Sequence, residues 1–109
     1  PGIKVMIIRK TYPELMANHI KPLKALLKCG TDLAIATYND SRKELTFPNG
    51  SVILFKYCAS ENDVDNFQGL EFDVVFIDEA TQLSEGQIKA IVACVRGVNN
   101  FPKKVIYTV

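Results

Sequence analysis

Three short apolar runs constrain the fold of this chain more than any other feature. They occupy residues 3–8, where only Lys4 interrupts the run, residues 74–77, and the end of residues 103–109, where the run follows two lysines. Strands that are apolar on both faces are typical of a parallel sheet covered by helices on both sides. We therefore expect these three segments to be neighbouring, buried strands of one mainly parallel sheet.

Two segments between these runs have the apolar spacing of helices that pack on a sheet. The apolar positions are Met16, Ile20, Leu23 and Leu27 in the first segment and Ile88, Ile91, Val92 and Val95 in the second. Thr11 and Glu14 have the spacing of a capping box before the first helix. Ser84 and Gln87 have the same spacing before the second helix. Pro22 is expected to kink or divide the first helix.

Residues 45–55 predict an antiparallel hairpin. Asn49 and Gly50 lie between two segments rich in β-forming residues. Asn-Gly in this position is a strong signal for a type I′ turn, in which both central residues have positive φ. Phe47 and Val52 are then expected to pair across the turn.

Together these elements predict an α/β fold with a mainly parallel sheet, flanking helices and one antiparallel β-hairpin. Residues 33–38 are a further expected strand, and residues 60–66 are expected to form a loop or one short helical turn. The sequence contains no linker, internal repeat or low-complexity segment, so residues 1–109 are expected to form a single domain.

The composition excludes several classes of protein. Hydrophobic residues make up 48% and charged residues 23% of the chain, which is typical of a globular protein and argues against disorder. The net charge of +1 gives no strongly basic footprint, so any DNA contact must come from a local patch. No apolar run approaches the ~20 residues of a membrane span. The three cysteines lack zinc-site spacing and are expected to be reduced thiols of a cytoplasmic protein.

Asp78 and Glu79 directly follow the run of residues 74–77, and this pattern is that of a Walker B motif. Ligands of open α/β sheets bind just outside the carboxyl ends of buried strands. The first acid can hold the Mg²⁺ that bridges the ATP phosphates, and the second can polarise the attacking water. We expect Asp78 on the metal side and Glu79 as the catalytic base; the alternative is a strand end with two solvated acids.

A P-loop enzyme also needs the motif G-x-x-x-x-G-K-[ST] to cradle the phosphates. The chain contains no such motif, since Gly30-Thr31 lacks the lysine. We expect this Walker A loop to lie upstream of Pro1, which makes the chain an internal fragment that binds no ATP or Mg²⁺ by itself and is inactive. The missing unit is also expected to remove a strand from between the central strands, so that the isolated fragment associates with copies of itself.

Three stretches, residues 7–15, 45–55 and 66–80, resemble the ATPase domain of the large terminase subunit of tailed bacteriophages and prophages. The Phe-x-Gly of Phe67-Gln68-Gly69, shortly before the Walker B strand, is the most specific of these features. The resemblance implies a partial P-loop NTPase fold of the RecA and ASCE type. It covers nearly the whole chain.

The resemblance also implies the activity of the parent protein, a motor that hydrolyses ATP with Mg²⁺ to package viral DNA. Asp78 would coordinate Mg²⁺, Glu79 would activate water, and Thr108 would lie where the coupling motif of the family begins. The implied partners are double-stranded viral DNA, the portal, the small terminase subunit and further copies of the same subunit, in the cytoplasm of the bacterial host. A nuclease domain would follow the segment.

Four further residues have a functional and a structural interpretation. Arg9 ends the first strand, on the nucleotide-proximal edge, and is either a phosphate or inter-subunit contact or, as we favour, a capping or solvated cation beside Thr11. Gln68 and Gly69 either shape a loop that faces the nucleotide or form a simple turn. His19 is expected to be a solvated or packing residue on the helix surface.

Two other functions remain open from the sequence. A P-loop helicase fragment is favoured by a faint likeness of residues 11–15 and 78–81 to helicase motifs, and a second RecA-like domain after Val109 would support it. A non-enzymatic scaffold or binding module is the alternative if no Walker A loop precedes the chain.

Overall fold

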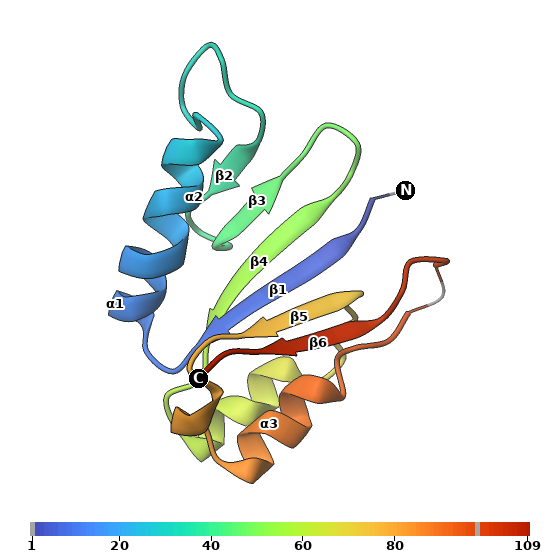
Figure 1. Cartoon of the computed structure of the whole chain (residues 1–109). Helices are drawn as coiled ribbons and strands as arrows, with labels where there is room; N and C mark the ends of the chain where they lie inside the picture. Colours follow the sequence, from blue (N-terminus) through green and yellow to red (C-terminus); the bar gives the residue numbers. More distant parts are fainter. Residues whose placement is uncertain (1, 98) are drawn as a thin grey trace.

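The protein is a three-layered α/β structure in which a six-stranded sheet lies between two groups of helices (Figure 1). The computed structural model describes residues 2–97 and 99–109. The strands are β1 (Lys4–Arg9), β2 (Thr37–Asn39), β3 (Glu44–Thr46), β4 (Val52–Tyr57), β5 (Val74–Ile77) and β6 (Lys104–Tyr107). The helical segments are α1 (Tyr12–Leu15), the π-helical η1 (Met16–Ile20), α2 (Lys21–Leu26), the 3₁₀ segments η2 (Glu61–Phe67) and η3 (Ala80–Gln82), and α3 (Glu85–Val92).

The strand order is β2-β3-β4-β1-β5-β6. The strands β4, β1, β5 and β6 are parallel to one another, whereas β2, β3 and β4 form an antiparallel meander. The prediction that the three apolar runs are neighbours in a mainly parallel α/β sheet is therefore confirmed. The antiparallel part is larger than the single predicted hairpin, because β2 adds a third strand to it.

Two apolar cores cover the two faces of the sheet. Met6 and Ile8 of β1 are fully buried against the side of α3 and η2. Ile7, which lies between them in the sequence, packs instead with Leu15 and Ile20 on the side of α1 and α2. This alternation follows from the period of two residues in a strand. A strand that is apolar at every position can thus serve both cores.

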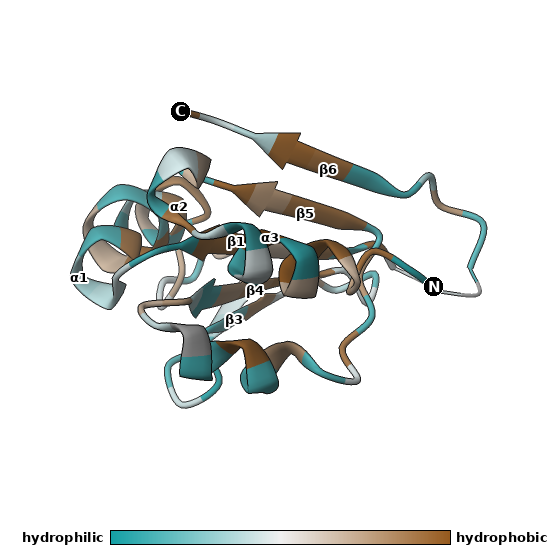
Figure 2. Ribbon diagram, turned by 90° about the horizontal axis from the view of Figure 1, so that it is seen from below, coloured by the Kyte–Doolittle hydropathy of each residue, from teal (hydrophilic) through white to brown (hydrophobic). Residues whose placement is uncertain are grey.

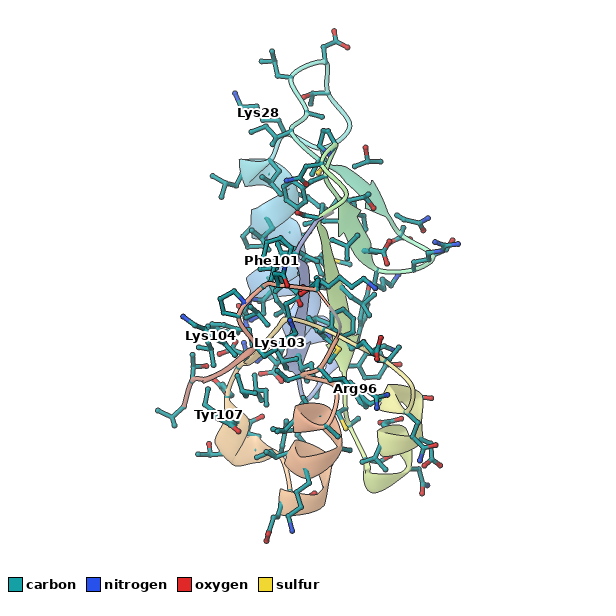
Figure 3. The ribbon with its side chains drawn as sticks, turned by 90° about the vertical axis from the view of Figure 1, so that its right-hand side faces the viewer. Lys28, Arg96, Phe101, Lys103, Lys104 and Tyr107 are labelled. Carbon is teal, nitrogen blue, oxygen red and sulfur yellow. The ribbon has the colours of Figure 1, made fainter. Side chains whose placement is uncertain are left out.

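The burial predicted for the C-terminal run is wrong. β6 forms an edge of the sheet, and its Ile106 and Tyr107 are 42% and 52% exposed. The middle of the strand is coloured as hydrophobic, although the strand lies at the outside of the sheet (Figure 2). Figure 3 labels Lys104 and Tyr107 on this outer strand. In addition, β1, β5 and β6 pair directly, so the prediction of a strand missing from between the central strands is also wrong.

The hairpin of β3 and β4 forms as predicted, but its turn differs. The N–H of Phe47 donates to the oxygen of Ser51 at 2.9 Å, so these two residues face each other and Val52 pairs with Thr46. Gly50 has a φ of 89°, whereas Asn49 does not have a positive φ. The loop is thus a three-residue connection, in which a turn is followed by a glycine in the left-handed region. Pro48 explains the change, since its fixed negative φ suits the first position of such a turn.

The first helix is continuous, and Pro22 does not divide it. A π-turn (Met16–Ile20) precedes Pro22, and α2 continues after it. Thr11 makes no side-chain cap, because its hydroxyl donates to the Glu14 carboxylate at 2.7 Å instead. The apolar stripe is confirmed, with Ile20 fully buried.

The remaining expectations are met in part. The capping box of Ser84 and Gln87 starts α3 as predicted. The strand predicted at residues 33–38 is limited to its end, since β2 begins at Thr37 and the preceding residues form turns. Among the described residues, no helix combines the length and the apolar character that crossing a bilayer requires.

Candidate functional site

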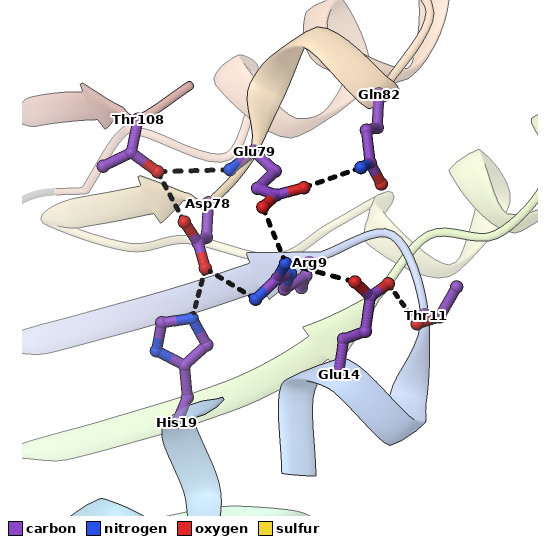
Figure 4. Close-up of polar contacts among 8 residues, drawn as sticks. All are labelled: Arg9, Thr11, Glu14, His19, Asp78, Glu79, Gln82 and Thr108. Atoms are coloured by element: carbon purple, nitrogen blue, oxygen red, sulfur yellow. Dashed lines mark hydrogen bonds and ion pairs between the residues drawn. The ribbon is translucent and has the colours of Figure 1, made fainter. Parts of the chain in front are cut away.

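The candidate site lies where three adjacent parallel strands end. Asp78 and Glu79 follow β5, Arg9 is the last residue of β1, and Thr108 follows β6. Because β5 lies between β1 and β6, the sheet brings these side chains together at its carboxyl edge (Figure 4). This is the edge at which open α/β sheets bind ligands.

Arg9 is the buried cation of this cluster. Its side chain is only 8% exposed and contacts three carboxylates: Asp78 at 3.2 Å, Glu79 at 2.9 Å and Glu14 at 3.1 Å. The favoured interpretation of Arg9 as a capping or solvated cation is therefore wrong. Its Nε is buried and has no hydrogen-bond partner among the described residues.

Asp78 accepts hydrogen bonds on both oxygens. Thr108 donates its hydroxyl to Oδ1, and Nε2 of His19 lies 2.7 Å from Oδ2. Burial alone would raise the pKa of the Asp78 carboxyl. The bonds from Thr108 and His19, with the positive charge of Arg9, outweigh burial and hold the pKa of Asp78 below its ordinary value of 3.8. Asp78 is therefore ionised at neutral pH.

Glu79 has a constrained backbone and an engaged side chain. Its φ of 53° and ψ of 51° lie in the left-handed region, which is uncommon for a residue other than glycine. Its N–H donates to the Thr108 hydroxyl at 3.1 Å, which helps to hold this turn. One carboxylate oxygen contacts Arg9 and the other accepts from Gln82 at 2.6 Å. Both oxygens of the expected base are thus occupied in this arrangement.

The structure brings Arg9, Asp78, Glu79 and Thr108 together, and it adds Glu14, Gln82 and His19, which sequence reasoning did not assign to the site. His19 was expected to be solvated or packed on the helix surface, but it reaches Asp78 and its side chain is only 18% exposed. Its sequence separation of 59 residues from Asp78 gives no local signal for this contact.

Gln68 and Gly69 do not join the cluster. They lie before β5, at its amino end, and Gly69 borders a recess that Lys4 and Val52 also line. A four-residue strand spans about 13 Å at ~3.3 Å per residue, so the length of β5 separates them from Asp78. The Phe-x-Gly pattern indicated the family, but it did not indicate that Gln68 and Gly69 lie at the opposite end of β5 from Asp78.

The cluster is a carboxylate site with a buried countercharge, the guanidinium of Arg9. The carboxylates of Glu14, Asp78 and Glu79 surround one guanidinium. Among the described residues, no group of three or more His, Cys, Asp or Glu side chains has the arrangement of a complete metal site. A cation at Asp78 would therefore need further ligands from a bound molecule or from water.

Comparison with known proteins identifies relatives of this arrangement. A family model described as "Terminase large subunit, T4likevirus-type, N-terminal" matches residues 4–98. No curated protein matches the chain.

Two sets of solved structures share the fold. The large terminase of a thermophilic bacteriophage matches with a TM-score of 0.72 and 22% identity, over 97% of this chain and 26% of that one. The same terminase in complex with ADP gives a TM-score of 0.68 at 22% identity. The ATPase domain of the Thermus phage P74-26 large terminase matches with a TM-score of 0.54 and 17% identity, over 99% of this chain and 48% of that one. The chain thus spans about a quarter of the first relative and about half of the second.

Proposed function

Because the chain belongs to the family of T4-like terminase large subunits, we propose that it supplies the hydrolytic half of the ATPase domain in a viral DNA-packaging motor. In this proposal residues 1–109 act as a single unit within a longer protein. The parent protein hydrolyses ATP and couples this reaction to the movement of DNA.

One observation carries the proposal: the adjacent acids Asp78 and Glu79 lie at the carboxyl end of a central parallel strand, with Arg9 and Thr108 from the two neighbouring strands beside them. Solvated acids at an ordinary strand end would not be expected to share a buried guanidinium. The arrangement supports a Walker B role for this pair.

Asp78 fits the requirements of a magnesium site. Mg²⁺ is commonly bound through one or two carboxylates, with the remaining ligands from phosphates and water. Asp78 is an ionised carboxylate, and the Thr108 hydroxyl beside it can bond to a ligand of the ion. When bound, Mg²⁺ neutralises charge on the ATP phosphates. Asp78 holds the metal side of the site in this proposal.

Glu79 is the proposed general base. A base must lie within hydrogen-bond reach of the water that it activates, and its carboxylate must be free to accept a proton. Here both oxygens are engaged by Arg9 and Gln82. We propose that at least one of these two contacts opens before Glu79 acts as the base.

The phosphate cradle must come from outside these residues. The sequence contains no G-x-x-x-x-G-K-[ST] motif. We propose that the isolated chain neither holds ATP and Mg²⁺ nor hydrolyses ATP. In the parent protein, a phosphate-binding loop would complete the site beside Asp78.

The partners follow from the family. We propose that the parent acts as a homo-oligomer on the portal, with the small terminase subunit and double-stranded viral DNA, in the host cytoplasm. Structural neighbours solved with ADP and with ATP-gamma-S support nucleotide binding by the parent. Membership of the terminase family argues against a helicase fragment.

The test compares two substitutions in a protein that joins this chain to its phosphate-binding loop. Glu79→Gln keeps the size of the side chain but removes the base, so hydrolysis should fall by roughly 10²–10⁴-fold while binding of ATP with Mg²⁺ is retained. Asp78→Asn should also weaken Mg²⁺-dependent binding, because it removes charge at the metal. Nucleotide affinity and single-turnover hydrolysis separate the two roles. Normal hydrolysis by Glu79→Gln would overturn the Walker B role, and the ATPase function would then rest on the family resemblance alone.

A further inference from the structure

His19 contacts Asp78 across the gap between two elements. Its Nε2 lies 2.7 Å from Oδ2 of Asp78, and both side chains are 18% exposed. The imidazole ring also packs edge-on against Phe76 of β5, with ring centroids 6.3 Å apart. Figure 4 shows His19 rising from its helix toward Asp78, on the opposite side from Thr108. The contact is short and is supported by packing on the strand that carries the acid.

The direction of this hydrogen bond follows from the state of Asp78. An ionised carboxylate can only accept hydrogen bonds. Two acceptor atoms would repel each other at 2.7 Å, so Nε2 of His19 must carry a hydrogen. His19 therefore donates to Oδ2, while Thr108 donates to Oδ1. The carboxylate is held from both ends by donors that come from different elements.

The helix reaches Asp78 through an irregular turn. Met16–Ile20 form a π-turn, and the N–H of Lys21 donates to the oxygen of Met16, five residues earlier. A π-turn contains more residues than an α-turn. It therefore brings His19 closer to the face that carries Glu14 than an α-helix would. Glu14 contacts Arg9 and His19 contacts Asp78, so this helix face meets the acid cluster at two points.

Pro22 supplies a physical reason for the π-turn. Proline has no N–H, and within an α-helix its ring clashes with the carbonyl group four residues earlier, here that of Asn18. Pro22 lies in the first turn of α2, directly after the π-turn. In the wider turn the Asn18 carbonyl lies away from the ring of Pro22. The hydrogen bond that an N–H at position 22 would donate to this carbonyl in an α-helix is then not required. A sequence feature that we expected to break the helix instead changes the direction of one side chain.

Arg9 is less specific than His19 as a contact of Asp78. Its guanidinium is shared among Asp78, Glu79 and Glu14. His19 is the other described contact of Oδ2, and its Nε2 lies closer to that oxygen, at 2.7 Å against 3.2 Å for Arg9. A metal ligand that is already held in one orientation loses less freedom when the ion binds.

We propose that His19 is a positioning residue, which the Pro22-dependent π-turn directs at Asp78 so that this carboxylate is preorganised for a divalent cation. The inference rests on the proposed function, since it assumes that Asp78 is on the metal side of the site. The inference adds His19 and the π-turn of Met16–Ile20 to that site.

The first measurement tests positioning without a metal. In the isotopically labelled chain, side-chain coupling constants report whether Asp78 occupies one χ1 rotamer or several. We expect one rotamer in the unsubstituted chain and averaging in His19→Ala. Amide spectra and melting temperature control for folding, since a positioning role predicts changes that are confined to the cluster. A single, unchanged Asp78 rotamer in a folded His19→Ala chain would overturn the proposal.

The second measurement is made on the protein that joins this chain to its phosphate-binding loop. It uses Mn²⁺ alone as the probe, with paramagnetic broadening of the Asp78 and Thr108 signals as the readout. Loss of a group that orients a metal ligand typically weakens affinity 10–100-fold, so we expect His19→Ala to bind Mn²⁺ about tenfold more weakly. His19→Gln places an amide N–H near the position of Nε2 and should restore binding. His19→Asn reaches only to the position of Nδ1 and should behave as His19→Ala does. Equal affinities for the Gln and Asn variants would contradict the proposal.

Pro22→Ala tests the origin of the contact. Alanine favours the regular helix, so this variant should lose the π-turn, show the same averaging of Asp78 as His19→Ala, and be no less stable to heat. Retention of the His19–Asp78 contact in Pro22→Ala would overturn the assigned role of the proline.

Asp78→Asn distinguishes the proposed metal role of Asp78 from the proposed positioning role of His19. If Asp78→Asn leaves Mn²⁺ affinity unchanged, or if no Mn²⁺ effect is centred on Asp78 in the unsubstituted protein that carries the phosphate-binding loop, the proposed metal role fails. If Asp78→Asn weakens binding while His19→Ala does not, the metal role stands and only the positioning role of His19 is overturned.

Discussion

Asp73 is a buried carboxylate at the amino end of β5, at the opposite edge of the sheet from Asp78. It is 1% exposed and accepts from the N–H of Lys4 at 2.9 Å, from Lys103 at 2.9 Å and from Asn99 at 3.2 Å. Burial by itself would raise the pKa of Asp73, but these donors outweigh it and the pKa lies below 3.8. This single side chain ties the start of β1 to the segment that leads into β6.

Asp73 therefore makes stability depend on pH in the acid range. Because its pKa is lowered by folding, its contribution is complete above about pH 4 and is lost as pH falls through the lowered value. Asp73→Asn should cost about 2 kcal/mol at neutral pH, since it removes a charged acceptor. The difference from the unsubstituted chain should shrink below pH 4. Thermal unfolding between pH 2 and 7 measures it, with the exposed Asp32→Asn as the control. Parallel pH curves for Asp73→Asn and the unsubstituted chain would contradict this assignment.

The hairpin between β3 and β4 shows how one glycine determines an element. Gly50 has a φ of 89°, and its N–H donates to the oxygen of Phe47 at 3.0 Å. A Cβ at Gly50 would approach nothing closer than the backbone nitrogen of Gly2, at 3.7 Å. The requirement for glycine is thus conformational and does not come from crowding.

Gly50→Val should destabilise the chain by about 1–3 kcal/mol, because a β-branched residue strongly disfavours positive φ. Gly50→Asn is the matched control, since asparagine tolerates the left-handed region and should cost much less. Chemical denaturation measures both variants. Similar midpoints for the Val and Asn variants would argue against a left-handed residue at this position.

At the scale of the whole molecule, the sheet has two edges of different character. β2 is three residues long and is the outer strand of the antiparallel meander. β6 exposes Ile106 and Tyr107, and within the described chain no strand pairs with its outer side. An exposed apolar edge is a template for pairing with another strand.

We expect the isolated chain to associate with copies of itself through β6. The weight-average mass in sedimentation experiments should rise with concentration. Ile106→Lys should suppress this rise, because a charged side chain on an edge opposes pairing. Thr37→Lys, on the opposite edge strand β2, should have little effect. A chain that stays monomeric at high concentration, or an equal response of the two variants, would exclude this edge as the contact.

Local patterns in the sequence predicted the parts of the fold that depend on local physics. The parallel neighbours β1, β5 and β6, the capped helix α3 and the hairpin follow from hydrophobic runs, a capping box and a turn signal. The placement of Asp78 and Glu79 at the carboxyl end of β5 also followed from the sequence, because those residues directly continue the strand. The exposure of β6 did not follow, since an apolar run carries no information about whether a neighbour covers it.

The sequence by itself thus determined the class of the sheet, the strand that carries the two acids and the family to which they point. Only the tertiary structure decided which side chains surround those acids. Arg9 meets its carboxylates because β1 lies beside β5. His19 meets Asp78, 59 residues away in the sequence, because a π-turn alters the direction of its side chain. Secondary structure is encoded by residues a few positions apart, whereas the electrostatics of this site are set by strand order and by the packing of a helix across it.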